Sequence, residues 1–380
     1  LPDTAYASRL AMEYLGRLYG GHGGVDADGK RRVQAGRGQV TAYLRNEWGL
    51  NKILNDGGEK SRDDHRHHAV DAICIALTSA GTVKMLSDAA SRATDERRRR
   101  FGKVNPPWPT FLDDVRSSAE KLVVSHRVSR KVSGPLHEET NYSKPIPGTD
   151  GKGKPCEYRR VRKPLANLSE PEAQDIADPI VRKLVLDKLL ALGIKEPKKA
   201  FNNGANHPYL TTKDGRNIPI HKVRINKKVP TFTVGEGPRE RHVTTESNHH
   251  IEVVEMLDKK GKPKWEGHLV SLKDAYDRLK AGQPVVRRDH GEGKRFLFSL
   301  AGGETIEIDE GDGRRGIYVI RTISGSKYPG IEFVRINDAR KKKDIKEVKD
   351  WKTSLIGPLR ELNCQKVLIT PLGEVRRAND

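Results

Sequence analysis

Histidine and aspartate side chains are concentrated in one short stretch of the chain, directly before an apolar segment. Residues 61–78 read SRDDHRHHAVDAICIALT. On a helix, His67 and His68 lie four and three residues before Asp71, so the three side chains share a face, with Asp64 on the same side. A carboxylate is an oxygen ligand that Mg²⁺ or Mn²⁺ prefers, and an adjacent imidazole can orient or deprotonate water. The pattern is therefore compatible with a hard-metal catalytic site.

Two other interpretations of this pattern remain open. Histidines clustered at the start of a helix are more often solvated surface residues, and spacing alone favours that interpretation. A zinc site built from His65, His67, His68 and Asp71 is less favoured, because zinc ligands normally come from separate segments.

The elements that would position these residues are mainly helical. Tyr6, Leu10, Tyr14 and Leu18 recur at helical spacing and predict a helix over residues 4–19. Residues 30–50 predict a short strand, a glycine turn and a helix from about Gln39. A further helix is expected to begin with Asp63 or Asp64 as its N-cap and to continue past Leu77 to about residue 93. Helices and a strand with short links suit an α/β layer.

The rest of the chain changes character twice. Residues 95–111 form a basic, proline-rich connector that includes the run from Arg97 to Arg100, and a short helix is expected over 113–121. Residues 123–161 are basic and rich in Gly, Ser and Pro, so we expect them on a surface and not in a core. A helical pair broken at Pro179 follows. Beyond residue 217 the pattern is mostly β, with one inserted helix over 271–282.

Composition narrows the class of partner. The formal net charge is +20 and the sequence pI is about 9.8, which favours nucleic acid. Apolar runs are too short to span a membrane, and LPDTAYASRL lacks the regions of a secretory signal. The widely spaced Cys74, Cys156 and Cys364 exclude a disulfide framework and a CxxC zinc site. A reducing, cytoplasmic setting is therefore expected.

The stretch DDHRHHAVDAICIAL resembles the third RuvC-like motif of the CRISPR type II RNA-guided DNA endonucleases, which has His-His-Ala-x-Asp-Ala on a helix. The segment KRRVQAGRGQVTAYLRNEWGLNKIL is similar to the strand and helix before this motif in the compact type II-C branch, and LPDTAYASRLAMEYL to the return from an inserted HNH nuclease domain. VSHRVSRKVSGPLHEET resembles the phosphate-lock loop of that branch, and the β-rich remainder follows the order of its wedge and PAM-interacting domains.

The resemblance implies roles for individual residues. Asp71 matches the carboxylate that binds a catalytic metal, His68 matches the histidine that contacts a metal or activates water, and His67 has a supportive role at most. The implied reaction is phosphodiester hydrolysis with two Mg²⁺ (or Mn²⁺) ions. The aspartate and glutamate of the other RuvC-like motifs and an HNH segment are absent from this sequence. We therefore expect the C-terminal part of a longer nuclease, with an incomplete site that residues outside this chain complete.

The fold class implied is an α/β RNase H-like (RuvC) portion followed by β-rich α+β wedge and PAM-interacting domains. The expected division is a third RuvC-like segment over 1–124, a phosphate-lock loop and linker over 125–165, a wedge domain over 166–285 and a PAM-interacting domain over 286–380.

In this family base pairing with a guide RNA reads the target DNA, and the protein reads the heteroduplex shape and the PAM. Residues 125–134 alternate hydroxyl and cationic side chains, including Ser125 and Ser129, which suits phosphate oxygens. Contacts to phosphate are expected from Arg45, Arg127, Arg130, Lys131, Ser133, Lys341, Lys342 and Lys343. Candidates for reading PAM base edges are Arg321, Thr322, Ser324, Ser326, Lys327, Arg335 and Asn337. Arg335 and Asn337 are expected to project together from one strand.

The expected partners are guide RNA, target DNA with its PAM and the N-terminal part of the same nuclease, with no membrane. Two alternatives remain: a fragment of a transposon-encoded RNA-guided nuclease, or a catalytically silent RNA-binding module in which the histidines are structural.

Overall fold

The chain is divided into two compact units. The computed structural model describes residues 2–20, 24–35, 38–54, 62–82, 84, 104–128, 130–150, 153–311, 313–325, 328–378 and 380. Unit 1 comprises Leu1–Ser129, Met256–Glu266 and Leu300–Asp380, and unit 2 comprises Arg130–Glu255 and Gly267–Ser299. The division into four domains expected from the sequence stays a prediction.

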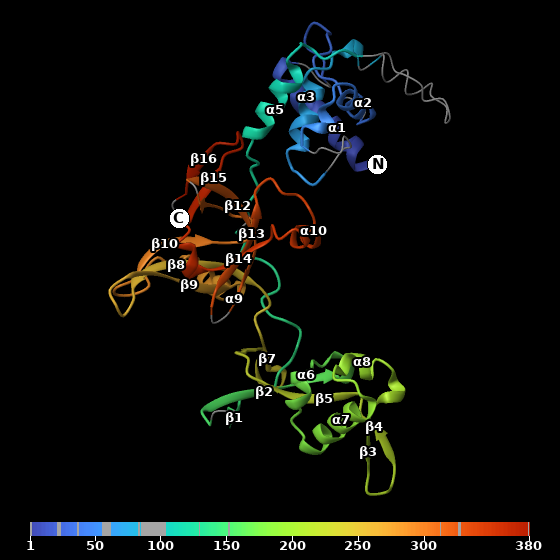
Figure 1. Ribbon diagram of the computed structural model, residues 1–380, viewed down its shortest axis with the longest axis vertical. Coiled ribbons are helices and arrows are strands. Elements are labelled where there is room, and N and C mark those ends of the chain that lie inside the picture. Colours follow the sequence, from blue (N-terminus) through green and yellow to red (C-terminus); the bar gives the residue numbers. More distant parts are fainter. Residues whose placement is uncertain are drawn as a thin grey trace. The chain divides into compact units, whose positions relative to one another are not determined.

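Unit 1 contains a group of helices built from the first third of the chain (Figure 1). They are α1 (Pro2–Gly16), the 3-10 helix η1 (Arg17–Tyr19), α2 (Gly38–Glu47), η2 (Leu50–Lys52), α3 (His67–Ala76) and α5 (Phe111–Lys121). Apolar residues at helical spacing on α2, α3 and α5 form one buried cluster: Val40, Leu44, Trp48, Leu50, Val70, Cys74, Phe111 and Val115. This packing fixes the orientation of α3, on which the predicted site residues lie.

The helix expected over residues 4–19 is confirmed as α1 and η1, but its apolar stripe faces solvent. Within the part of the chain that the structure describes, Tyr6, Tyr14 and Leu18 are 64%, 62% and 76% exposed. An exposed apolar stripe of this kind is typical of a surface that another segment or molecule covers.

Two local predictions were wrong. In place of the expected strand before α2, residues 24–35 have an isolated bridge between Val25 and Arg31. The helix α3 ends at Ala76, because Leu77 leaves the helical conformation, and does not continue unbroken to residue 93. Most of that expected extension, and the run from Arg97 to Arg100, lie outside the described residues.

The C-terminal part of unit 1 is a six-stranded antiparallel sheet in the order β14-β13-β12-β11-β15-β16. Its strands are β11 (Thr305–Gly311), β12 (Arg314–Ser324), β13 (Gly330–Arg335), β14 (Lys352–Leu355), β15 (Gln365–Ile369) and β16 (Val375–Arg377). Alternating apolar residues such as Ile306, Ile308, Tyr318, Ile320 and Phe333 are buried, and α10 (Lys342–Glu347) and α11 (Ile356–Leu359) connect strands. This region confirms the expectation of a β-rich C-terminal part.

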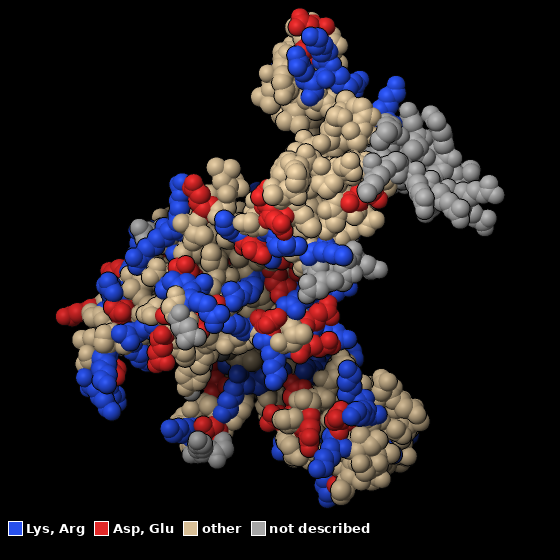
Figure 2. Space-filling model, turned by 45° about the horizontal axis from the view of Figure 1, so that its top comes forward, with Lys and Arg blue, Asp and Glu red and all other residues tan. Residues whose placement is uncertain are grey.

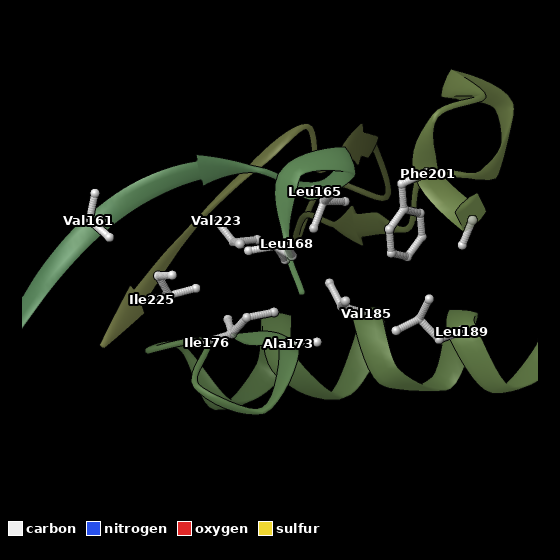
Figure 3. Close-up of a cluster of buried hydrophobic side chains, with 11 residues drawn as sticks. Val161, Leu165, Leu168, Ala173, Ile176, Val185, Leu189, Phe201, Val223 and Ile225 are labelled. Carbon is white, nitrogen blue, oxygen red and sulfur yellow. The ribbon is translucent and has the colours of Figure 1, made fainter. Parts of the chain in front are cut away.

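Unit 2 has a core between a sheet and helices (Figure 3). The sheet has the order β1-β2-β5, with β1 (Ile146–Thr149), β2 (Pro155–Pro164) and β5 (Lys222–Lys227). Its strands contribute Val161, Val223 and Ile225, which pack in one cluster with Val185 and Leu189 of α7. The helices and 3-10 helices are η3 (Leu165–Asn167), α6 (Glu170–Gln174), α7 (Pro179–Leu192), α8 (Pro197–Phe201), η4 (Gly204–Asn206) and η5 (Gly237–Arg239). The prediction that residues 123–161 contribute no core is therefore wrong, since Val161 is buried.

The predicted helix break at Pro179 is confirmed, and its cause is a cap. Asp178 accepts hydrogen bonds from the amides of Ile180 and Val181, and Pro179 fits the first helical position, where no N–H is needed. Two hairpins complete this part: β3 (Tyr209–Thr211) with β4 (Asn217–Pro219), and β6 (Phe232–Val234) with β7 (Arg241–Val243).

A third sheet has the order β10-β8-β9, and each of its strands has residues assigned to both units. The strands are β8 (Asn248–Leu257), β9 (Pro263–Ser271) and β10 (Arg295–Leu300), and the helix α9 (Leu272–Lys280) is the one expected near 271–282. Ser271 and Asp274 form a reciprocal capping box at its start. The chain is thus a mixed α/β protein with several antiparallel sheets, which confirms the sequence-based fold class at that level.

A buried carboxylate organises the third sheet within unit 2. Glu252 is 1% exposed and accepts hydrogen bonds from Arg278 (2.5 Å), the amide of Arg287 (2.6 Å) and His250 (3.2 Å), with His290 at 3.6 Å. Burial alone would raise the pKa of Glu252, but these hydrogen bonds outweigh it and lower the pKa to about 2. The side chain is therefore ionised throughout the ordinary pH range.

Among the described residues, no helix combines the length and the apolar character that crossing a membrane requires.

Candidate nuclease site and nucleic-acid surfaces

The start of α3 is stabilised by a turn and not by a side-chain cap. Asp64 precedes the helix and accepts hydrogen bonds from the amide and the guanidinium of Arg66, at 2.8 Å and 2.6 Å. Arg66 stands at the cap position, with no hydrogen bond from its side chain to the helix. The prediction of Asp63 or Asp64 as N-cap was therefore wrong by two or three residues, and Asp64 does not share the helical face of Asp71.

The two histidines that begin α3 have different environments. His67 is buried, and its Nδ1 donates to the carbonyl oxygen of Asp64 at 2.5 Å. His68 is exposed, and its ring centroid lies 4.0 Å from that of His67. His67 therefore fixes the turn before α3, whereas His68 presents an imidazole to solvent.

Asp71 is held by an arginine from the neighbouring helix. Nη1 of Arg45 on α2 donates to Oδ1 of Asp71 at 2.7 Å, and the two side chains are 4% and 20% exposed. Arg45 was predicted as a phosphate contact from the sequence. Its guanidinium is instead buried against α3, so its observed partner is Asp71. Any contact with phosphate stays a prediction and would need this ion pair to open.

The donor set of α3 fits part of a metal site. The carboxylate of Asp71 is a suitable oxygen ligand for a hard divalent ion, and the exposed imidazole of His68 is a possible nitrogen ligand. Mg²⁺ is six-coordinate, and no group of three or more His, Cys, Asp or Glu side chains within the described residues could hold a metal ion. The described residues can thus contribute ligands to such an ion, and the incompleteness of the site stays a prediction.

An open groove of about 720 Å³ lies beside His68 in unit 1. We call it the His68 groove. Three segments form it: the start of α3, the strap that follows α5, and the turn between β15 and β16. The lining residues are His65, Arg66, His68, Ala69, Lys121, Leu122, Val123, Val124, Ser125, Arg127, Pro371, Leu372 and Gly373. All the ionisable side chains among them are basic.

Hydrogen bonds hold the strap, residues 122–126, against the C-terminal sheet. The side chain of Asn337 accepts from the amide of Val124 and donates to the carbonyl of Leu122, both at 3.1 Å. Oγ of Ser125 donates to the carbonyl of Ile369 at 2.9 Å. Gly373 has φ +84°, and a Cβ there would lie 3.2 Å from the carbonyl oxygen of Val123, so this turn approaches the strap closely. The walls of the groove are therefore fixed to each other.

The predicted phosphate-lock residues are divided between the units. Ser125 and Arg127 belong to unit 1, where both line the His68 groove. Arg130, Lys131 and Ser133 belong to unit 2, where a guanidinium nitrogen of Arg130 donates to Oγ of Ser299 at 2.6 Å. Lys131 and Ser133 are exposed, and Ser129 lies outside the described residues. Contact with phosphate stays a prediction for each of them.

The PAM candidates lie in and after β12 and β13, but not as one row. Thr322 and Ser324 are exposed at alternate positions of β12, and the guanidinium of Arg321 donates to the carbonyl of Asp338 at 3.1 Å. Arg335 ends β13, where it pairs with Glu310 at 2.7 Å. The predicted candidates Ser326 and Lys327 fall outside the described part of the chain.

The expectation that Arg335 and Asn337 project together from one strand was wrong. The strand β13 ends at Arg335, and the amide of Asn337 is engaged by the strap. The spacing of two predicts a common face only while the strand continues. A role in base reading stays a prediction for both residues.

The lysine run at the start of α10 is partly neutralised. Lys342 pairs with Glu332 at 2.9 Å and lies 4.6 Å from the ring centroid of Trp351, and Lys343 lies 3.8 Å from Glu347. Lys341 is exposed. On the face drawn in Figure 2, Lys and Arg side chains are likewise spread among Asp and Glu. Local pairing, and not only the net charge, therefore decides which cations can meet a phosphate.

Sequence reasoning missed a basic surface on unit 2, which we call the β2–β5 ladder. Arg160 and Arg162 on β2 and Lys222 and Arg224 on β5 are exposed, and Arg162 lies directly across from Arg224. Among the described residues these four cations have no carboxylate partner at salt-bridge distance, and they line a groove of about 590 Å³. Like charges directly opposite each other destabilise a strand pair, so the arrangement suits an anionic ligand. The signal was the alternation of Arg160 and Arg162 around a single apolar residue.

Comparison with known proteins finds a family model that is similar to the helical part of unit 1. Residues 1–133, which include α3 and the strap, match the family model described as RuvC endonuclease subdomain 3. The segment containing His68 and Asp71 is therefore similar to a RuvC endonuclease subdomain.

Two curated relatives are similar to part of the chain. The chain is 29% identical over 151 residues to the CRISPR-associated endonuclease Cas9 of Campylobacter jejuni, a match that covers 35% of this chain and 15% of that protein. It is 27% identical over 159 residues to Cas9 1 of Streptococcus thermophilus, covering 38% of this chain and 13% of that protein. The chain thus spans much less than two thirds of the length of these relatives.

Solved structures share the fold beyond the segment that matches the family model. Streptococcus thermophilus Cas9 in complex with the AGAA PAM matches with a TM-score of 0.60 at 16% identity, over 100% of this chain and 38% of that chain. The type II-C Cas9 enzyme from Actinomyces naeslundii matches with a TM-score of 0.51 at 15% identity, over 90% of this chain and 40% of that chain. The resemblance to type II CRISPR endonucleases that the sequence indicated is confirmed.

Proposed function

We propose that this chain is the C-terminal portion of an RNA-guided DNA endonuclease and that its RuvC subdomain helps to cut the non-target strand. The observation that carries the proposal is the placement of Asp71 and His68 on α3 inside the segment that matches RuvC endonuclease subdomain 3. The expected finer architecture, an RNase H-like portion followed by wedge and PAM-interacting domains, forms part of this proposal.

The residues of α3 have separate roles in the proposed reaction. The carboxylate of Asp71, oriented by Arg45, is a ligand for a divalent ion, and residues outside this chain complete the site. A divalent ion such as Mg²⁺ or Mn²⁺ held there would supply Lewis-acid activation of water and stabilisation of the leaving oxygen. His68 presents its exposed imidazole to solvent, where it can orient water or accept its proton. His67, fixed by Asp64, holds the turn that positions both residues.

The partners proposed are guide RNA, target DNA with its PAM and the N-terminal part of the same nuclease. The β2–β5 ladder offers four neighbouring cations to a phosphate backbone, which suits a guide RNA recognised by shape. The exposed apolar stripe of α1 suits a surface that the missing part of a RuvC fold would cover. PAM reading by exposed residues of β12, such as Thr322 and Ser324, remains part of the proposal.

The test uses the complete nuclease that carries this segment, loaded with guide RNA and Mg²⁺. Asp71→Ala is expected to abolish nicking of the non-target strand, and His68→Ala to slow it by ~10²–10⁴-fold, the usual contribution of a positioned acid–base group. Cutting of the target strand by a separate nuclease domain should be unchanged in both. Asp113→Ala, at an exposed position of α5, is the matched control. If Asp71→Ala leaves both cuts intact, or abolishes both, the proposed role is wrong.

A further inference from the structure

Arg45 is a buried cation that is directed at the proposed metal ligand. Its side chain is 4% exposed, and it lies on α2, from which Val40 and Leu44 enter the buried apolar cluster. Its Nη1 donates to Oδ1 of Asp71 at 2.7 Å, whereas its buried Nε has no hydrogen-bond partner among the described residues. A cation taken out of water is costly unless an anion compensates it, so the fold holds Arg45 against Asp71.

The two carboxylate oxygens of Asp71 are therefore unequal for an approaching metal ion. A second cation at Oδ1 would meet the positive charge of Arg45 at short range, where little water screens it because the Arg45 side chain is buried. The side chain of Asp71 is 20% exposed, so an ion can reach it from solvent. Asp71 is thus suited to offer one oxygen, Oδ2, to a metal ion and is unsuited to chelate an ion with both oxygens.

Divalent ions differ in how well they accept a carboxylate that binds through one oxygen. Mg²⁺ is small, demands a near-ideal octahedron and keeps several of its waters, so one oxygen from a carboxylate suits it. Ca²⁺ takes more oxygen ligands at longer distances, in a flexible geometry that accepts carboxylates binding with both oxygens. The neighbouring imidazole of His68 offers a nitrogen, and Ca²⁺ prefers oxygen. A carboxylate restricted to one oxygen therefore disfavours Ca²⁺ more than Mg²⁺ or Mn²⁺.

We propose that Arg45 sets the metal selectivity of the site. By engaging Oδ1, it restricts Asp71 to one oxygen and so discriminates against Ca²⁺ in favour of Mg²⁺ or Mn²⁺. The inference rests on the proposed function, because that function makes Asp71 a metal ligand. Arg45 is a positioning residue, since it acts through Asp71 and not on the reacting atoms. Replacing a buried ion pair by well-packed apolar residues is often neutral for stability, so stability alone does not account for an arginine here.

The first test measures metal binding by the complete nuclease without guide RNA, so that RNA adds no metal sites. Electron paramagnetic resonance follows bound Mn²⁺, and the bound Mn²⁺ that is lost in Asp71→Ala defines the site. Mg²⁺ and Ca²⁺ are then titrated separately as competitors. In Arg45→Met, the affinity for Ca²⁺ relative to Mg²⁺ should rise about tenfold, because the released Oδ1 can bind Ca²⁺ and one contact to a charged group is worth about that factor.

A second measurement follows strand cutting by the guide-loaded nuclease at a fixed Mg²⁺ concentration with increasing Ca²⁺. Nicking of the non-target strand should become about tenfold more sensitive to Ca²⁺ in Arg45→Met, matching the change in relative affinity. Target-strand cutting by the separate nuclease domain is the internal control and should keep its sensitivity. Arg45→Lys retains the buried charge without the rigid planar fork, so it should shift the selectivity less, in the same direction. This variant carries the test if Arg45→Met does not fold.

Two controls separate metal selectivity from stability. Val115→Ala, in the same buried cluster, should destabilise unit 1 without changing the relative affinity for Ca²⁺ and Mg²⁺. Arg116→Met removes an exposed arginine that pairs with Asp113 at 3.0 Å and should also leave it unchanged. The proposal is overturned if the Arg45 variants keep the wild-type selectivity, or if Val115→Ala shifts it equally. Failure of the proposed function would appear instead as unchanged Mn²⁺ binding and unchanged nicking in Asp71→Ala.

Discussion

Glu252 provides a sharp test of the energetics of unit 2. Its carboxylate is 1% exposed and compensates the charge of Arg278, 2.5 Å away, while it also accepts from the amide of Arg287. Glu252→Gln keeps the shape of the side chain but removes the charge. Breaking a buried ion pair by removing one partner typically costs about 3–5 kcal/mol. Arg278 retains its hydrogen bond to the carbonyl of Val285, so we expect a loss at the low end of this range. Glu252→Gln should lower the free energy of unfolding by about 3 kcal/mol at neutral pH.

The lowered pKa of Glu252 gives a similar value for the stabilisation that its carboxylate contributes, and it also predicts how that stabilisation depends on pH. The pKa is lowered from 4.5 to about 2 in the folded state, and each pKa unit corresponds to about 1.36 kcal/mol. A lowered carboxylate pKa stabilises the folded state above pH 4.5, and this contribution of about 3 kcal/mol is lost as the pH falls toward 2. The difference in the free energy of unfolding between wild type and Glu252→Gln should therefore decrease to about 1 kcal/mol at pH 3.

Hydrogen exchange of the β8 amides is the appropriate assay, because it reports stability segment by segment in a chain with two units. At pH 7 the variant should exchange about 10²-fold faster than wild type, with a much smaller ratio at pH 3. Comparison at equal pH removes the intrinsic exchange rate. Glu236→Gln, at an exposed position of the same unit, should leave β8 unchanged. A ratio that is constant between pH 7 and pH 3 would refute the assigned pKa and the reasoning behind it.

Two further predictions concern unit 1. In a PAM-library screen of the complete nuclease, Arg335→Ala should weaken binding to the preferred PAM by ~1–3 kcal/mol and reduce discrimination among PAM variants. Lys342→Ala should weaken binding to all PAM variants alike and reduce the salt slope by roughly one unit. Uniform weakening by both variants would place the PAM-reading residues elsewhere. Arg45→Met should lower the stability of unit 1 by about 3 kcal/mol, because Asp71 loses its buried partner. Thermal unfolding followed by tryptophan fluorescence measures it, since all four tryptophans lie in unit 1, and an unchanged midpoint would contradict it.

The sequence predicted those elements whose apolar residues follow a regular period. Helices α5, α7 and α9 lie close to where the sequence predicted helices, and strands β8, β10 and β11 lie beyond residue 217, where the predicted pattern is mostly β. The strand β2 was missed because its alternation is carried by Arg160 and Arg162, with Val161 as its only buried residue. A pattern of charge around one apolar residue does not distinguish a strand edge from a surface loop.

The candidate site was predictable only in part, for a related reason. The motif around His68 and Asp71 is local and was recognised from adjacent letters. The partner of Asp71 is 26 residues earlier in the chain, and the engagement of Asn337 by the strap joins segments more than 200 residues apart. Contacts of this kind depend on tertiary packing, which the spacing of residues in a single sequence does not specify.

The hydrogen bonds of Asn337 have a thermodynamic consequence for two segments of unit 1. The side chain of Asn337 is hydrogen-bonded to the strap, and its backbone carbonyl oxygen accepts a hydrogen bond from the amide of His65 at 2.9 Å. Asn337 therefore links the loop after β13 to the turn before α3. A ligand that binds more tightly to one arrangement of the loop must then favour the matching arrangement of the turn. By linkage the effect is reciprocal, and a molecule bound beside His68 would change the affinity of the loop by the same factor.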